Sequence, residues 1–198
     1  MKKVVLIAFT LCMTYAVKAQ QDLQFTHFMF DKLSFNPAST GFKNAFCLTG
    51  INRRQWTGLD AGEPTTTLIN FTAPKIPLIK GALGFTYYND ELGWETNNMF
   101  RLSYAFHLSE IGISNIGGGN IAIGASVSYA MKKINAQWTP PNTAPGPNPG
   151  EDNSIPTSRE QDAALGFNLG VYYDIPGKLY AGISTTNLTE SELSTFKL

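Results

Sequence analysis

Histidine and cysteine, the side chains that most often bind metals or act as nucleophiles, are rare in this chain. His27 and His107 are the only histidines, and neither has a cysteine or a carboxylate at the spacing of a metal-ligand motif. Cys12 lies in the leader, so Cys47 has no partner for an intrachain disulfide once the leader is removed. Flanked by apolar residues, Cys47 is expected to pack as a small apolar side chain. The sequence therefore predicts no catalytic residue and no metal site.

Two other patterns that could bind a ligand have simpler interpretations. Gly117, Gly118 and Gly119 lie between expected strands rather than before a helix, which predicts a turn and no phosphate-binding loop. Asp90 and Asp162 lie beside loops and could bind a cation, but such residues are common in solvated turns. The sequence also lacks a Gly-x-Ser-x-Gly frame for a nucleophilic serine. We expect no cofactor and a protein that is not an enzyme.

Seven segments alternate large apolar with small or polar residues, which is typical of β-strands. In the clearest one, Phe100, Leu102 and Tyr104 alternate with Arg101 and Ser103. Because successive side chains of a strand point to opposite faces, one face is apolar for about 30 Å, the length of a tilted membrane-spanning strand. The seven segments are residues 45–56, 65–73, 81–89, 98–108, 120–131, 163–174 and 179–186.

The polar side of these strands distinguishes a membrane barrel from a soluble sheet. It carries Gly, Ala, Ser, Thr and Asn rather than the charged residues of a water-facing sheet, and charged residues make up only 15% of the chain. We interpret the apolar face as lipid-directed and the small-residue face as lumen-directed, with a soluble secreted β-sandwich as the alternative. A charge at Leu102 or Val127 is therefore expected to prevent membrane assembly, whereas a charge at Ser103 is expected to be tolerated better.

The ends of the chain and the loop lengths fit an exported barrel. Residues 1–19 combine two lysines, an apolar core and a terminal Ala19, which predicts a secretory signal peptide. Residues 20–44 then form a periplasmic leading segment, and residues 45–198 carry the strands. Strand parity places the proline-rich loop of residues 132–162 outside the cell. By the same parity, the loops of residues 57–63 and 90–95 lie outside, and the tight turn of residues 175–178 lies in the periplasm.

Charge and aromatic content indicate which partners to expect. The net charge is zero and the sequence has no basic block, which excludes nucleic acid as a partner. Tyrosine and tryptophan near strand ends favour a membrane-interface belt, with ordinary sheet packing as the alternative. These residues are Trp56, Tyr87, Tyr88, Trp94, Tyr172, Tyr173 and Tyr180.

A series of short motifs spans nearly the whole chain after the leader. Their residues are Gln24, Phe25, Met29, Phe30, Asn36, Pro37, Ala38, Gly41, Arg53, Gln55, Trp56, Pro64, Thr66, Asp90, Gly93 and Tyr104. Together these motifs resemble the PorP/SprF family of outer-membrane proteins of the type IX secretion system of Bacteroidetes. The resemblance implies a non-enzymatic barrel in outer-membrane lipid that works with type IX secretion components. It would support the export or surface attachment of a large adhesin-like partner, and it could serve gliding motility.

The strand count bears on completeness. Members of the family have about fourteen strands, and single-chain bacterial barrels have an even number. We therefore expect an all-β, antiparallel transmembrane β-barrel of which this chain is the N-terminal half, either as a fragment of a longer gene product or as one of two copies that close a ring. The competing function is that of a porin or a FadL-like transporter of small or hydrophobic solutes, which a lumen lined by small residues would permit.

Overall fold

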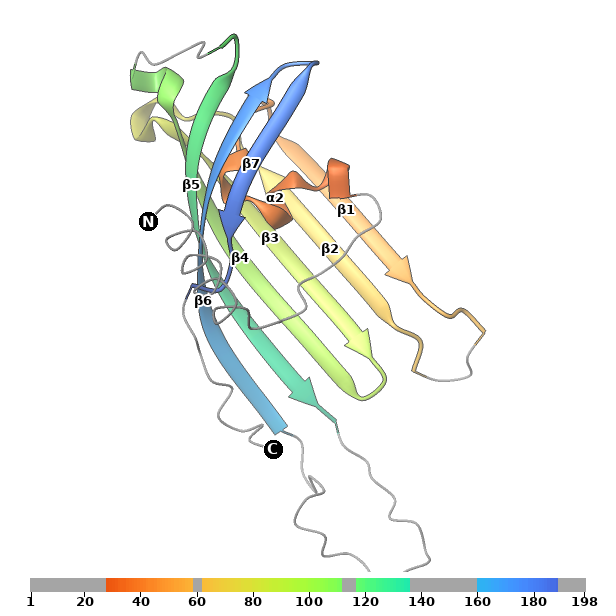
Figure 1. Cartoon of the computed structure of the whole chain (residues 1–198). Helices are drawn as coiled ribbons and strands as arrows, with labels where there is room; N and C mark the ends of the chain where they lie inside the picture. Colours follow the sequence, from red (N-terminus) through yellow and green to blue (C-terminus); the bar gives the residue numbers. More distant parts are fainter. Residues whose placement is uncertain (1–27, 59–61, 112–116, 136–159, 189–198) are drawn as a thin grey trace, which may run out of the picture. The chain divides into compact units, whose positions relative to one another are not determined.

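The computed structural model describes residues 28–58, 62–111, 117–135 and 160–188 (Figure 1). The chain divides into a short unit, Met1–Phe30, whose described part is the 3₁₀ turn η1 (Phe28–Phe30), and a larger unit, Asp31–Leu198. The expected signal peptide and the motif residues Gln24 and Phe25 lie outside the described residues. The larger unit carries all the described strands.

Seven antiparallel strands form one sheet, in which every strand pairs with its neighbours in the sequence. Each predicted segment overlaps one of these strands along most of its length, so all seven strand predictions are confirmed. The strands are β1 (Cys47–Arg54), β2 (Thr65–Thr72), β3 (Gly81–Leu92), β4 (Glu95–His107), β5 (Asn120–Ile134), β6 (Glu160–Ile175) and β7 (Leu179–Thr185).

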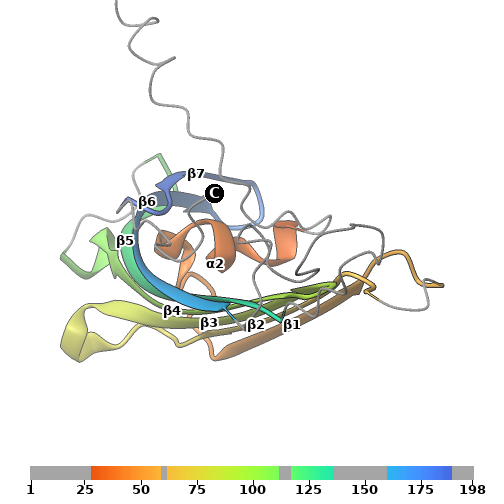
Figure 2. The same cartoon turned by 90° about the horizontal axis from the view of Figure 1, so that it is seen from below.

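The sheet curls into a half-barrel with β1 and β7 at its two edges (Figure 2). In the described part of the chain these two edge strands do not pair with each other. The expected fold class, half of an antiparallel β-barrel, is confirmed. Among the residues described, no helix has the length and apolar character needed to cross a membrane.

The two faces of the sheet differ as the alternation predicts. On β4, Phe100 and Leu102 are exposed, whereas Arg101, Ser103 and Ala105 are buried. The same alternation continues along β5 and β6, so that the large apolar side chains share the convex face and the small ones share the concave face. This division is the one that the period of two requires of a curled sheet.

The loop predicted at residues 90–95 is much shorter in the structure. β3 continues to Leu92 and β4 begins at Glu95, and these two residues are paired across the strands. Only Gly93 and Trp94 remain as the turn, and Gly93 has a φ of +57°. A two-residue hairpin needs a residue that accepts positive φ, and glycine does so without a steric penalty. The polar residues before this turn, which suggested a loop, instead continue the strand.

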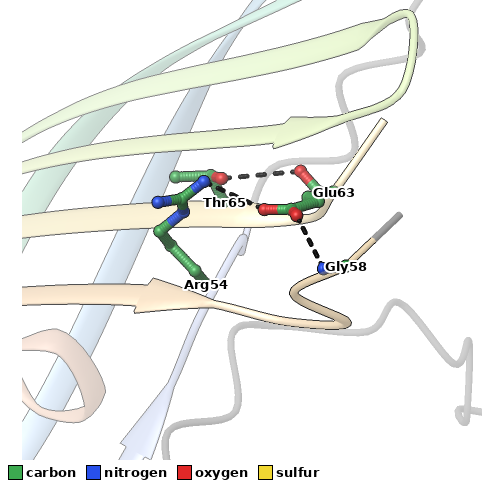
Figure 3. Close-up of polar contacts among 4 residues, drawn as sticks. All are labelled: Arg54, Gly58, Glu63 and Thr65. Carbon is green, nitrogen blue, oxygen red and sulfur yellow. Dashed lines mark hydrogen bonds and ion pairs between the residues drawn. The ribbon is translucent and has the colours of Figure 1, made fainter. Parts of the chain in front are cut away.

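The loop between β1 and β2 is braced at its base (Figure 3). Arg54 Nη2 forms an ion pair with Glu63 Oε2 at 3.0 Å, and the backbone N–H of Gly58 donates to Glu63 Oε1 at 3.0 Å. The hydroxyl of Thr65 donates to the Glu63 carbonyl at 3.4 Å. Glu63 therefore ties both arms of this loop together. The long loop predicted at residues 132–162 gives its ends to β5 and β6, and its middle lies outside the described residues.

Candidate functional site

Residues 31–42, which we call the inner segment, pack against the concave face of the sheet (Figures 1 and 2). The inner segment contains the helical turn α2 (Lys32–Phe35) and the 3₁₀ turn η2 (Pro37–Ser39). Asp31 caps α2 by accepting a hydrogen bond from Ser34 N at 3.3 Å, and Asn36 caps η2 by accepting from Ala38 N at 2.9 Å. The proline at the start of η2 has the φ that such a turn requires. Two side-chain caps therefore shape a short stretch without hydrophobic periodicity into a compact body.

Asn36 joins the inner segment to the last two strands. Its Nδ2 donates to the carbonyl oxygens of Val171 on β6 at 3.0 Å and of Ile183 on β7 at 3.4 Å. One residue away, Ser184 Oγ on β7 donates to the Phe35 carbonyl at 2.7 Å. These bonds attach the edge strand β7 to the inner segment as well as to β6.

Glycines on the concave face make room for the inner segment. A Cβ at Gly124 on β5 would collide with the backbone of Pro37 and Ala38, and one at Gly170 on β6 would collide with the Asn36 side chain. At Gly84 on β3, a Cβ would lie 3.1 Å from Thr40 Oγ1. The inner segment thus approaches three strands more closely than a side chain on those strands would allow.

Gly41 and His107 hold the far end of the inner segment. Gly41 has a φ of +81°, and a Cβ there would collide with that of Ala82, so both its backbone and its surroundings require glycine. His107 Nε2 lies 2.8 Å from the Thr40 carbonyl, and its ring packs at 4.8 Å from that of Phe42. His107 is therefore a buried packing and hydrogen-bonding residue of this contact.

A buried polar cluster fixes the opposite end of the inner segment. Asn70 Nδ2 on β2 donates to Asp31 Oδ1 and, at 3.1 Å, to Ser34 Oγ. Arg101 Nη1 on β4 donates to the Ser34 carbonyl at 2.6 Å. Burial raises the pKa of the Asp31 carboxyl, and the hydrogen bonds from Ser34 and the charge of Arg101 offset this only in part. Each of these polar groups is oriented by a partner on the other side of the contact.

Lys32 contributes a cation–π contact to the same interface. Its Nζ lies 3.7 Å from the centre of the Tyr180 ring and 5.6 Å from that of Tyr172. Tyr172 is buried on the concave face, as is Tyr88. The belt prediction is therefore wrong for Tyr88 and Tyr172, because alternation directs their rings to the concave face although they lie near strand ends. Trp56 and Trp94 are exposed at the loop end of the sheet.

The motif residues separate into groups in space. Asn36, Pro37, Ala38 and Gly41 belong to the inner segment. Arg53, Thr66 and Asp90 are neighbours across β1, β2 and β3, and Thr66 Oγ1 donates to Asp90 Oδ1 at 2.7 Å. The others lie elsewhere: Gln55, Trp56, Pro64 and Gly93 near the loop end of the sheet, Tyr104 near the opposite end, and Met29 and Phe30 in the N-terminal unit.

Sequence reasoning missed most of the residues that form the contact between the inner segment and the sheet. Asp31, Lys32 and Ser34 were not singled out, although aspartate is a favoured N-cap residue. Gly124 and Gly170 belong to the small-residue face of the strands, which by itself predicts no particular contact. Inward-facing glycines on two neighbouring strands are the signal that could have indicated a close backbone approach.

The arrangement is suited to holding a polypeptide segment. The inner segment is held by side-chain caps, by hydrogen bonds to backbone carbonyls, by close packing against glycines of the sheet and by a cation–π contact of Lys32. In the described part of the chain, no group of three or more His, Cys, Asp or Glu side chains lies together as a metal site. Asp90 is bonded to Thr66, and Asp162 Oδ1 accepts from Ala163 N at 2.8 Å.

An antiparallel, curled sheet with large apolar side chains on its convex face is typical of strand-built membrane proteins. The family described as type IX secretion system membrane protein PorP/SprF matches residues 17–198, and the chain belongs to this family. The family resemblance read from the motifs is thereby confirmed. No curated protein and no solved structure matches the chain significantly.

We expect Asn36→Ala to destabilise the fold and to loosen β7. The change removes two bonds to strand carbonyls and the cap of η2, and buried groups that lose partners cost about 1–3 kcal/mol. Urea unfolding in detergent measures the loss. The matched control is Asn52→Ala, because Asn52 makes one exposed bond to Thr67 Oγ1. Equal losses for the two variants would contradict the role of Asn36 as the attachment of β7.

Proposed function

We propose that this chain is a non-enzymatic component of the outer membrane that serves type IX secretion by binding an exported surface protein. Membership of the family supports the link with secretion. The observation that carries the rest is the inner segment, which occupies the concave face that would otherwise line a channel. A half-barrel whose concave face carries a packed segment is better suited to act as a docking scaffold than as an open pore.

The convex face supports residence in a bilayer. Its exposed large side chains include Phe85, Phe100, Leu102, Ile123, Val127, Phe167, Leu169 and Val171. β3 has 12 residues, and a strand of that length rises about 40 Å, or about 30 Å across the membrane when tilted. A strand of this length is able to cross the hydrocarbon core of a membrane.

The loop end of the sheet is where we place the exported partner. The β1–β2 loop is braced by Glu63, and a Cβ at Gly62 would lie 3.5 Å from Gly93 Cα, so this loop touches the β3–β4 turn. Trp56 and Trp94 project from these two connections and are exposed. Tryptophans held on braced loops are typical of protein-binding surfaces. In this proposal the partner is a large adhesin-like protein. If that adhesin drives gliding, the chain also supports gliding motility.

The proposed function is tested in cells by surface labelling of a type IX exported protein. Deletion of the gene should abolish surface display of the cognate protein. The double variant Trp56→Ala and Trp94→Ala should lower display while leaving the level of the chain in the outer membrane unchanged. Trp94→Ala alone removes only one of the two exposed tryptophans, so it should lower display less than the double variant does. Normal display in the deletion strain would overturn the proposal.

The second candidate is a gated transporter. Large outer-membrane transporters also carry a filled lumen, so the inner segment by itself is compatible with transport. Planar-bilayer conductance separates the two functions. A scaffold should remain electrically silent, whereas steady solute-dependent conductance of the wild-type protein would favour the transporter.

A further inference from the structure

The connection between β2 and β3 projects an apolar tip from the sheet. It contains the 3₁₀ turn η3 (Pro77–Ile79), and Leu78 at its apex is 91% exposed. Ile79 is also exposed, as is the adjacent Lys80. Figure 2 shows this turn, in yellow, on the far side of β3 and β4 from α2. The tip therefore projects on the convex side, where the large apolar side chains are.

This tip is held rigidly against the convex face. Tyr104 on β4, from the convex set of side chains, donates its hydroxyl to the Ile79 carbonyl at 2.7 Å. Its ring lies over Gly81, where a Cβ would be only 2.7 Å away. Within the turn, Lys80 N donates to the Pro77 carbonyl at 3.2 Å, and Lys80 has a left-handed φ of +51°. A left-handed non-glycine residue carries strain, so the turn is a defined conformation that keeps Leu78 exposed.

Water is an unfavourable environment for such a tip, and a lipid surface suits it. An apolar apex beside an exposed lysine has the character of an interfacial anchor, with the leucine among acyl chains and the ammonium at the phosphate level. The tip is continuous with the apolar convex face. It also lies at the opposite end of β3 from Trp94, and the strand between them is long enough to span a bilayer.

We propose that the β2–β3 turn inserts Leu78 and Ile79 into the headgroup boundary of the leaflet opposite to that of the β3–β4 turn, with a phospholipid surface as its partner. This inference rests on the proposed placement of the convex face in a bilayer. With the β3–β4 turn at the other end of both strands, the anchored turn fixes the depth of β3 and β4 in the membrane.

The test measures fluorescence quenching by brominated lipids. The full chain carries Leu78→Trp in a background where Trp56, Trp94 and Trp138 are changed to phenylalanine, and it is reconstituted into phosphatidylethanolamine and phosphatidylglycerol vesicles. Leu102→Trp in the same background reports the convex face. Lys178→Trp reports the β6–β7 turn, which lies at the same end of the sheet.

We expect the tryptophan fluorescence of Leu78→Trp to be quenched mainly by lipids brominated near the headgroup. The fluorescence of Leu102→Trp should be quenched mainly by lipids brominated near the methyl end of the acyl chain. Lys178→Trp should lose little fluorescence. Quenching at Leu102→Trp without quenching at Leu78→Trp would overturn the anchor and leave the membrane face standing. Quenching at neither position would overturn both. Equal quenching at Leu78→Trp and Lys178→Trp would show that the turn has no anchoring property of its own.

A second measurement, in isolated outer membranes, separates lipid from a protein partner. Leu78→Cys in a Cys47→Ser background should react with a lipid-soluble maleimide and resist a charged one. Reaction with both reagents would place the tip in water. Resistance to both would place it against protein. Either of these two results would overturn the proposal.

Discussion

Leu102→Arg and Val127→Arg should each abolish the folded, membrane-inserted form of the chain. Leu102 and Val127 are paired across β4 and β5 near the middle of both strands, and their side chains are 60% and 44% exposed on the convex face. An arginine on the lipid face at the bilayer midplane costs about 2–4 kcal/mol. That is a large fraction of the net stability of a typical domain. The measurement is the amount of heat-modifiable protein in the outer-membrane fraction.

Ala130→Arg is the matched control on the concave face of β5. Ala130 is exposed and lies on the opposite face from Val127, so the same charge there can be solvated. Ser103, the expected tolerant position, is unsuitable because it is 0% exposed between the sheet and the inner segment. The expectation that a charge is tolerated better at Ser103 than at Leu102 or Val127 stays a prediction. Equal loss of folded protein for Val127→Arg and Ala130→Arg would mean that the faces are wrongly assigned.

The strands could be predicted because one local property determines them. Over most of β4 and β5, large side chains alternate with small or polar ones, and only an extended chain places such a set on one face. The face assignment followed from the small residues for the same reason. The β3–β4 turn was misjudged because Asp90 and Glu91 are polar, and local composition cannot distinguish a solvated strand end from a loop.

The inner segment could not be predicted because its structure depends on contacts that are distant in the sequence. Asn36 and Val171 are bonded across 135 residues, and no local pattern records that distance. Residues 31–42 have neither a helical nor a strand period. The position of Tyr172 near a strand end suggested a ring at the membrane interface. The alternation along β6 instead predicts that its side chain points inward, and the structure shows it buried on the concave face.

Gly124→Ala should displace the inner segment. The added Cβ would collide with backbone atoms of Pro37 and Ala38, which cannot rotate away as the end of a side chain could. Overpacking of this kind costs about 1–3 kcal/mol. Trypsin cleavage after Lys32 measures the displacement, because Lys32 is held over the Tyr180 ring only while the inner segment is docked.

Gly50→Ala separates this effect from the general consequence of replacing a strand glycine. Gly50 lies on β1 with nothing within 4 Å of its Cβ position. Alanine in the interior of a strand is favoured over glycine by about 0.5–1 kcal/mol, so this control should be neutral or more stable. Faster cleavage after Lys32 and a lower urea midpoint are therefore expected for Gly124→Ala alone. If both variants resist trypsin as the wild type does, the inner segment is not held by the close approach to β5, and Asn36 and the Asp31 cluster must hold it without that contact.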